Sequence, residues 1–334
     1  MDININLLNL SIVVKTDEGE VLQKIIDEFH YFLTDEKSYR KFTVNIHHEA
    51  PPKIQELIAT KVLPHAIIYK HRREKFIDYL GKGQIHQKGN SYFIYSLDKD
   101  FLFEMAFLTI HSLFGDLAQK RDLHRIHALA GTYRNRDFIL MLPSGGGKSS
   151  MLAEFLEDPE FKVISDDCPF IDKKGKIHPF PTKISLSKIP ANSTLTDLPW
   201  HQFHRTLYPP KYVLSLSYLD NKVNDRPSDS RPILIWGVRS SYRSPVIMRM
   251  GPVETMKSLM ENMVVGIGLP QIVEIFLNFN YVSDISKLFK SFFKRGWAAF
   301  HLYMRSFHCK IILGESVQKN CQAIKDLINE KNPR

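Results

Sequence analysis

A glycine-rich segment near the middle of the chain carries the residue types that hold phosphate groups. Residues 143–149 read Pro-Ser-Gly-Gly-Gly-Lys-Ser. Glycines let backbone N–H groups point at an anion, and a lysine adds a mobile positive charge for the β- and γ-phosphates of a nucleotide. A serine hydroxyl after the lysine can bind Mg²⁺. The predicted phosphate site comprises Ser144, Gly145, Gly146, Gly147, Lys148, Ser149 and Ser150.

The segment departs from the Walker A motif at one position. The motif Gly-x-x-x-x-Gly-Lys-Ser/Thr requires a glycine where Leu142 stands, although the Gly-Lys-Ser that closes it is present. A glycine-rich turn followed by a chance Lys-Ser pair is the alternative without function. The flanking residues favour the phosphate site, because Phe138–Leu142 reads as a buried strand and Met151–Leu156 as a helix.

Two adjacent carboxylates and one histidine are predicted to lie near this loop. Phe161–Ser165 reads as a short strand that leads into Asp166 and Asp167. Neighbouring side chains in extended structure point to opposite faces, so one aspartate would face the nucleotide. Leu123–Thr132 reads as a strand paired with the loop's strand, which would put His127 one strand away. A solvated acidic turn and a structural histidine are the alternatives.

These residues need an α/β framework to position them, and the composition is compatible with one. The chain has 334 residues, of which 43% are hydrophobic and 24% charged, as in ordinary globular proteins. Its three cysteines, Cys168, Cys309 and Cys321, are widely separated, which argues against a disulfide framework or a zinc knuckle. We expect a protein of the cytoplasm, where thiols stay reduced.

No targeting or membrane-spanning segment is expected. The N-terminal residues lack the basic region and apolar core of a secretion signal. The most apolar stretch, Phe101–Leu117, contains Glu104, His111 and Asp116, and is predicted to be a core helix rather than a transmembrane segment.

The formal net charge of +9 points to acidic partners or simply to solubility. Nucleic acid, an anionic membrane surface and an acidic substrate would all fit, but no nucleic-acid-binding motif accompanies the charge. The basic amphipathic segment Ser286–Arg295 could touch a membrane or an acidic partner. Packing on a neighbouring helix, with lysines at the rim, is the alternative that we favour for this segment.

The order of predicted elements suggests two parts. Residues 1–120 form an N-terminal α/β region, for substrate or partner binding, and residues 121–334 form the P-loop catalytic domain, with a helical segment at about 252–298. Predicted helices are Val21–Leu33, Phe101–Gln119, Val253–Met263 and Ser316–Ile328. Predicted strands include Lys41–Ile46, Ala66–Tyr69, Ser91–Leu97, Ile233–Val238, Val246–Met250, Phe300–Met304 and Cys309–Leu313.

Residues 124–184 resemble the catalytic core of HPr kinase/phosphorylase, a relative in fold of ATP-dependent phosphoenolpyruvate carboxykinase. The resemblance lies in His127 before the loop, in the loop's Ser-Gly-Gly-Gly-Lys-Ser, and in the Asp-Asp pair after the next strand. It implies an α/β fold with a P-loop nucleotide-binding core of that type. It also implies that His127 is the active-site histidine, Lys148 the phosphate-binding lysine, Ser149 the Mg²⁺ ligand and Asp167 the base. We further expect Asp166 to support Asp167 and to help bind the metal.

The sequence also departs from that family. Leu142 replaces the first glycine, and Ser150 stands where the family has a glutamate. No second Mg²⁺-binding glutamate is recognisable downstream of Ile184, and neither the N-terminal region nor residues 185–334 match. The chain therefore resembles a divergent relative of the family. Several such relatives accompany peptide-modifying gene clusters, and they include relatives that phosphorylate lasso-peptide precursors.

The expected function is an ATP- and Mg²⁺-dependent kinase that phosphorylates a hydroxyl, preferably a serine of a peptide or small protein. A kinase for free serine or a natural product is one alternative. A nucleotide-binding scaffold without catalysis is another, and the missing glutamate is its main support. The sequence leaves open the donor nucleotide, ATP or GTP, and whether the chain forms a homo-oligomer.

Overall fold

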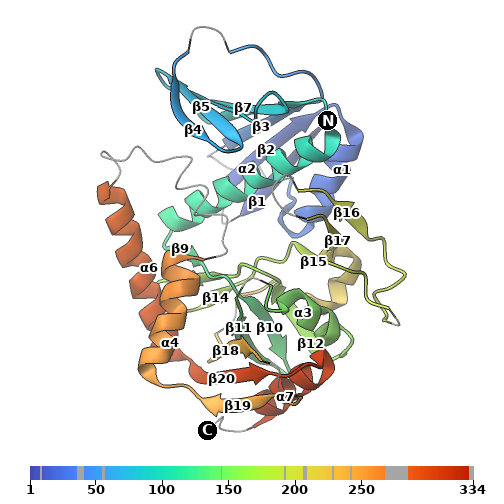
Figure 1. Ribbon diagram of the computed structural model, residues 1–334, viewed down its shortest axis with the longest axis vertical. Coiled ribbons are helices and arrows are strands. Elements are labelled where there is room, and N and C mark those ends of the chain that lie inside the picture. Colours follow the sequence, from blue (N-terminus) through green and yellow to red (C-terminus); the bar gives the residue numbers. More distant parts are fainter. Residues whose placement is uncertain are drawn as a thin grey trace. The chain divides into compact units, whose positions relative to one another are not determined.

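The computed structural model divides into two compact units, each described by itself below (Figure 1). Unit 1 contains Met1–Leu117 and Gln202–Lys211, and unit 2 contains Ala118–His201 and Tyr212–Arg334. The chain is a mixed α/β protein with several β-sheets, including sheets that combine parallel and antiparallel strands. The structure describes residues 1–7, 10–35, 41–54, 57–143, 145–191, 193–205, 209–227, 229–240, 243–267 and 285–330.

Unit 1 is built on an eight-stranded sheet of order β1-β2-β3-β8-β7-β6-β5-β4. The β2–β3 and β3–β8 pairs are parallel, and the other pairs are antiparallel. Along β3, Val44 and Ile46 are buried while their neighbours are partly exposed, as expected of a sheet with one core face. The strands are β1 (Asp2–Leu7), β2 (Leu10–Thr16), β3 (Lys41–His47), β4 (Ala59–Leu63), β5 (Ala66–His71), β6 (Glu74–Asp78), β7 (Gly83–Lys88) and β8 (Ser91–Ser96).

Two helices complete the core of unit 1. Helix α1 (Gly19–Glu28) ends earlier than the predicted Val21–Leu33 and is followed by a 3₁₀-helix, η1 (His30–Phe32). Helix α2 (Lys99–Lys120) packs near the end of α1, where the rings of Phe29 and Phe114 lie 5.8 Å apart. By length and apolarity α2 could cross a membrane, but 78% of its most apolar window is buried inside the protein.

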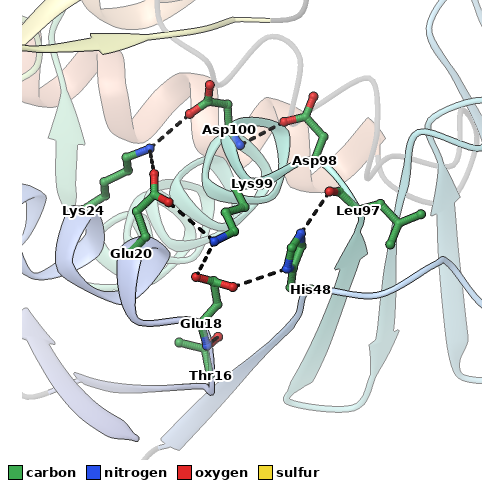
Figure 2. Close-up of polar contacts among 9 residues, drawn as sticks. All are labelled: Thr16, Glu18, Glu20, Lys24, His48, Leu97, Asp98, Lys99 and Asp100. Carbon is green, nitrogen blue, oxygen red and sulfur yellow. Dashed lines mark hydrogen bonds and ion pairs between the residues drawn. The ribbon is translucent and has the colours of Figure 1, made fainter.

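Charged side chains connect the N-terminal ends of these two helices (Figure 2). Lys99 Nζ lies 2.9 Å from Glu18 and 3.6 Å from Glu20, while Lys24 Nζ lies 3.0 Å from Glu20 and 3.1 Å from Asp100. His48 adds a contact of 3.3 Å to Glu18. The Asp98 carboxylate accepts hydrogen bonds from the backbone N–H groups of Asp100 and Phe101, and so caps α2. We call Glu18, Glu20, Lys24, His48, Lys99 and Asp100 the charge network.

Unit 2 contains a six-stranded sheet of order β12-β10-β11-β18-β20-β19. Strands β11, β18 and β20 are mutually parallel, while β10 runs antiparallel between β11 and β12. The predicted pairing of the P-loop strand with the strand before it is confirmed: Arg134 and Asn135, both with positive φ, form a two-residue hairpin turn. The strands are β10 (Leu129–Tyr133), β11 (Arg136–Met141), β12 (Phe161–Ser165), β18 (Ile233–Arg239), β19 (Val246–Arg249) and β20 (Phe307–Leu313).

Two small sheets accompany it. One has the order β14-β13-β9, and in it β13 and β14 form a hairpin closed at Gly175, whose φ is +74°. In the other, β15 pairs antiparallel with β17, and the chain then forms a 3₁₀-helix, η2 (Leu216–Lys222). Their strands are β9 (Leu123–Arg125), β13 (Phe170–Asp172), β14 (Ile177–His178), β15 (Lys183–Leu186) and β17 (Lys211–Ser215). Most of β16 (His201–Phe203) belongs to unit 1.

Helices α3 (Lys148–Leu156), α4 (Pro252–Leu259), α6 (Ile285–Arg305) and α7 (Val317–Asn329) belong to unit 2, and α4 continues into a π-helix, η3 (Met260–Val265). The predicted strand Phe300–Met304 is wrong, because these residues lie inside α6. The buried positions there, Ala298, Ala299 and Leu302, follow helical spacing and join the core under the sheet. Of the predicted helical segment 252–298, residues 268–284 lie outside the described residues.

Candidate functional site

The glycine-rich loop connects β11 to α3, as the phosphate site requires. Gly145 and Gly147 have φ of +74° and +96°, a region that favours glycine. Gly146 donates its N–H to Pro143 O at 2.9 Å, and a Cβ on Gly146 would lie 2.8 Å from that oxygen. Each of these glycines therefore has a backbone reason to be there. Ser144, predicted to bind phosphate, lies outside the described residues.

Leu142, which breaks the Walker A pattern, is accommodated by a glycine on the neighbouring strand. Its side chain is buried, and its Cδ2 lies 2.1 Å from where a Cβ of Gly237 would stand. Gly237 belongs to β18, which pairs with β11. The leucine thus occupies space that any other residue at 237 would fill. A lone glycine within an apolar strand is the sequence signal for such a close approach, and our sequence reasoning did not use it.

Lys148, at the start of α3, folds back over the loop. Its side chain is 8% exposed, and its Nζ donates a hydrogen bond to Leu142 O at 3.1 Å. The same Nζ lies 2.9 Å from His127 Nε2 and 3.8 Å from Asp167 Oδ1. The ammonium group therefore lies next to the loop, in contact with a carbonyl oxygen and an imidazole nitrogen.

His127 lies in the short segment between β9 and β10, so the predicted continuous strand Leu123–Thr132 is wrong. Strand β9 pairs with β13, whereas β10 pairs with β11 and β12, so the residues between them change sheets. The His127 N–H is bonded to Asn262 O at 2.9 Å, and the N–H of Ala128 to Asp167 O at 3.0 Å. These bonds to distant backbone atoms replace a strand partner and bring the imidazole to Lys148.

Asp167 is the accessible member of this group. Its side chain is 54% exposed, and its Oδ1 lies 3.1 Å from His127 Nε2. That nitrogen can accept from Lys148 when it is unprotonated, or donate to Asp167 when it carries a proton, but not both. The contacts of His127, Lys148 and Asp167 thus depend on where one proton resides.

Ser149 and Asp166 form a second pair on the other side of the α3 start. Ser149 Oγ donates to Asp166 Oδ2 at 3.2 Å, and the Ser185 N–H lies 3.4 Å from the same oxygen. A hydroxyl and a carboxylate are hard oxygen donors of the kind that Mg²⁺ prefers, and Mg²⁺ commonly completes its shell with water and substrate phosphates. Among the described residues, no group of three His, Cys, Asp or Glu side chains could hold a metal by itself. The residues present therefore fit Mg²⁺ bound together with a nucleotide.

The two aspartates reach different partners although they are neighbours. Strand β12 ends at Ser165, and from the bend that follows Asp166 turns to Ser149 while Asp167 turns to His127 and Lys148. Ser150, also predicted to bind phosphate, has an exposed side chain. The structure thus brings His127, Lys148, Ser149, Asp166 and Asp167 together around one loop.

A second histidine lies three residues from His127. His124, on β9, is buried, and no described residue bonds to either of its ring nitrogens. Burial lowers the pKa of His124 to about 4, and the positive charges of Arg295 and Lys294 act in the same direction. This imidazole is therefore neutral at pH 7.

A search with known family models finds no match to this chain, and a search of curated proteins finds no relative.

Proposed function

We propose that this protein is a phosphotransferase that moves the γ-phosphate of ATP to a hydroxyl group. The observation that carries the proposal is the convergence of a buried lysine, a histidine and an exposed aspartate at the mouth of a glycine-rich loop. Phosphoryl transfer needs mainly positioning and charge neutralisation, and this small set of groups is sufficient for both. The proposal includes a P-loop core of the HPr kinase/phosphoenolpyruvate carboxykinase type, in a divergent relative of HPr kinase.

The loop and the start of α3 would hold the phosphates. The positive φ angles of Gly145 and Gly147 and the N-terminus of α3 are features that favour an anion at this point. The ammonium of Lys148, which now contacts Leu142 O at 3.1 Å, would exchange that carbonyl for phosphate oxygens. A buried ammonium acts strongly on such oxygens because little water screens it.

Ser149 and Asp166 would hold Mg²⁺. Their oxygens lie 3.2 Å apart at the first turn of α3, beside the predicted phosphates. Bound there, Mg²⁺ would supply positive charge against the phosphate oxygens of the nucleotide.

Asp167 would accept the proton of the acceptor hydroxyl. The acceptor oxygen forms a bond to the γ-phosphorus as the bond to the bridging oxygen breaks, which leaves ADP, a phosphate ester and a protonated Asp167. The exposure of this carboxylate allows an acceptor to approach it. His127, 3.1 Å away, orients Asp167 and can exchange a proton with it.

The preferred acceptor is a serine of a peptide or small protein, and the proposed location is the cytoplasm. A free serine or natural-product hydroxyl would use the same groups. A nucleotide-binding scaffold without transfer is the rival, because Ser149 and Asp166 alone are a small metal-binding set.

The test is incubation of the full chain with labelled ATP, Mg²⁺ and serine-containing peptides, next to Asp167→Asn. We expect transfer by the wild type and a loss of about 10²–10⁴-fold in the variant, with ATP affinity kept. Asp158→Asn, beyond the end of α3 opposite the loop and paired with Lys325, serves as the matched control. Saturable ATP binding with neither transfer nor hydrolysis would favour the scaffold, and absence of ATP binding would overturn both.

A further inference from the structure

Helix α6 presents two very different faces. One face packs against α4, η3 and β13, and its residues Ala298, Ala299 and Leu302 are fully buried. Arg295 is buried on the same side, where it donates to Gln119 Oε1 at 2.7 Å and to Val264 O at 3.4 Å. This face explains why the helix belongs to the core of unit 2.

The other face is apolar but exposed. Phe289, Phe293 and Trp297 are 62%, 74% and 60% exposed, at the spacing of one helical stripe. They border a shallow depression of about 500 Å³ at Gly296, where a Cβ would meet no atom within 4 Å. Soluble proteins rarely expose apolar side chains in such a continuous group without using them. The aromatic stripe comprises Phe289, Phe292, Phe293, Trp297, Phe300 and Met304.

Helix α6 and the strand after it are basic in sequence, but several of their cations are paired or buried: Lys294 pairs with Asp122, Lys310 pairs with Glu254, and Arg295 is buried. Residues 285–314 contain six lysines and arginines and no aspartate or glutamate. Lys290 is exposed next to the stripe, and Lys294, one turn further along, is 37% exposed with its Nζ directed to Asp122. The stripe therefore has the exposed cation of Lys290 beside it.

These features favour an anionic membrane surface over a second copy of the chain. A second copy of α6 has no acidic residue in 285–305 to offer to Lys290, whereas an anionic lipid headgroup supplies a partner of opposite charge. Phenylalanine and tryptophan on one side of a helix with lysines beside them is the pattern of helices that lie in the membrane interface. We propose that the aromatic stripe of α6 binds the surface of membranes that contain anionic lipids.

Co-sedimentation of the full chain with vesicles tests the proposal. The vesicles are phosphatidylcholine alone or phosphatidylcholine with phosphatidylserine, and the variant is Phe289→Ser/Phe293→Ser/Trp297→Ser. We expect binding to the anionic vesicles and a loss of at least about tenfold in the variant. Lys290→Gln should weaken binding by about fivefold, and less at high salt. The matched control is Ile58→Ser/Val62→Ser, which removes two exposed apolar residues of unit 1.

Tryptophan fluorescence gives a reading that does not depend on sedimentation. In a Trp200→Phe/Trp236→Phe background, Trp297 is the remaining tryptophan, and its emission should shift to the blue on adding anionic vesicles. Binding by the triple serine variant equal to that of the wild type would overturn the proposal. Absence of vesicle binding by the wild type would also overturn it. This holds if light scattering shows a monomer, and equally if it shows a dimer that the serine substitutions separate into monomers. None of the substituted residues belongs to the proposed kinase site, so failure here leaves that proposal standing.

Discussion

Each unit contains lysines close to carboxylates, but the lysines of the two groups differ in their burial and in their partners. In the charge network of unit 1, Lys99 and Lys24 each contact two carboxylates (Figure 2). Glu20 and Asp100 are exposed, and Glu18 is partly exposed. In unit 2, Lys148 is 8% exposed, contacts a carbonyl and an imidazole, and has its carboxylate at 3.8 Å. The network neutralises its own charges, while in the proposed phosphate site a bound anion would replace the groups next to the buried cation.

Counting ion pairs would not separate the proposed phosphate site from the charge network. Exposed pairs gain little, because water and salt screen them and ordering the side chains costs entropy. A lysine buried beside backbone N–H groups and a helix start carries a charge that acts strongly on a ligand. Burial and the nature of the partners, rather than the number of contacts, separate Lys148 from Lys99.

The largest expected effect tests this separation directly. Lys148→Met should lower kcat/KM for phosphoryl transfer by about 10²–10³-fold, because the γ-phosphate loses its charge-assisted donor. Lys99→Met, the same substitution in the charge network, should leave kcat/KM within about twofold of wild type. Initial rates with labelled ATP measure both. An equal loss of kcat/KM in the two variants would contradict this distinction, because it would mean that the charge network also takes part in phosphoryl transfer.

The loop was predictable from the sequence because its signals are local. Positive-φ glycines, an apolar run before them and helix-forming residues after them all lie within 20 residues or so. The position of His127 was not predictable in detail, because its backbone depends on Asn262 and Asp167, which are distant in sequence. The Phe300–Met304 error has a similar origin: a short apolar run fits a strand or a helix, and only packing under the sheet decides.

Leu142 sharpens the comparison from the side of stability. Leu142→Gly would restore the Walker A pattern but empty the space against Gly237, at a cost of about 3 kcal/mol or more in the free energy of unfolding. In unit 1, Leu80→Gly should be neutral or stabilising, because Leu80 is exposed and has a φ of +54°. Urea unfolding of both variants gives the two free energies. A fully stable Leu142→Gly protein would mean that the leucine is not packed as described.

His124 makes the free energy of unfolding of unit 2 depend on pH. Its pKa is about 4 when folded and near 6.5 when unfolded, so the unfolded chain alone takes up a proton between these values. Stability is therefore unaffected by this group above pH 6.5, falls as the pH drops from 6.5 to 4, and levels off below. The loss amounts to about 3 kcal/mol. Urea unfolding from pH 7 to 4 measures it, and His124→Gln should flatten the profile over this window; an unchanged slope would contradict the assignment.

The smallest expected effects lie in unit 1, where one residue should still stand out. Asp98 accepts hydrogen bonds from the N–H groups of Asp100 and Phe101 at 3.0 and 3.1 Å, so Asp98→Ala should cost about 1 kcal/mol through the lost cap of α2. Asp98→Asn keeps an acceptor and should recover most of that loss. Lys99→Ala, which breaks ion pairs with Glu18 and Glu20, should lower the Tm less than Asp98→Ala does, and high salt should erase its effect. If Lys99→Ala instead lowered the Tm more than Asp98→Ala, the ion pairs of the charge network would be important for the stability of unit 1. Lys99 and Lys148 would then differ in the nature of their partners and not in how strongly they interact with them.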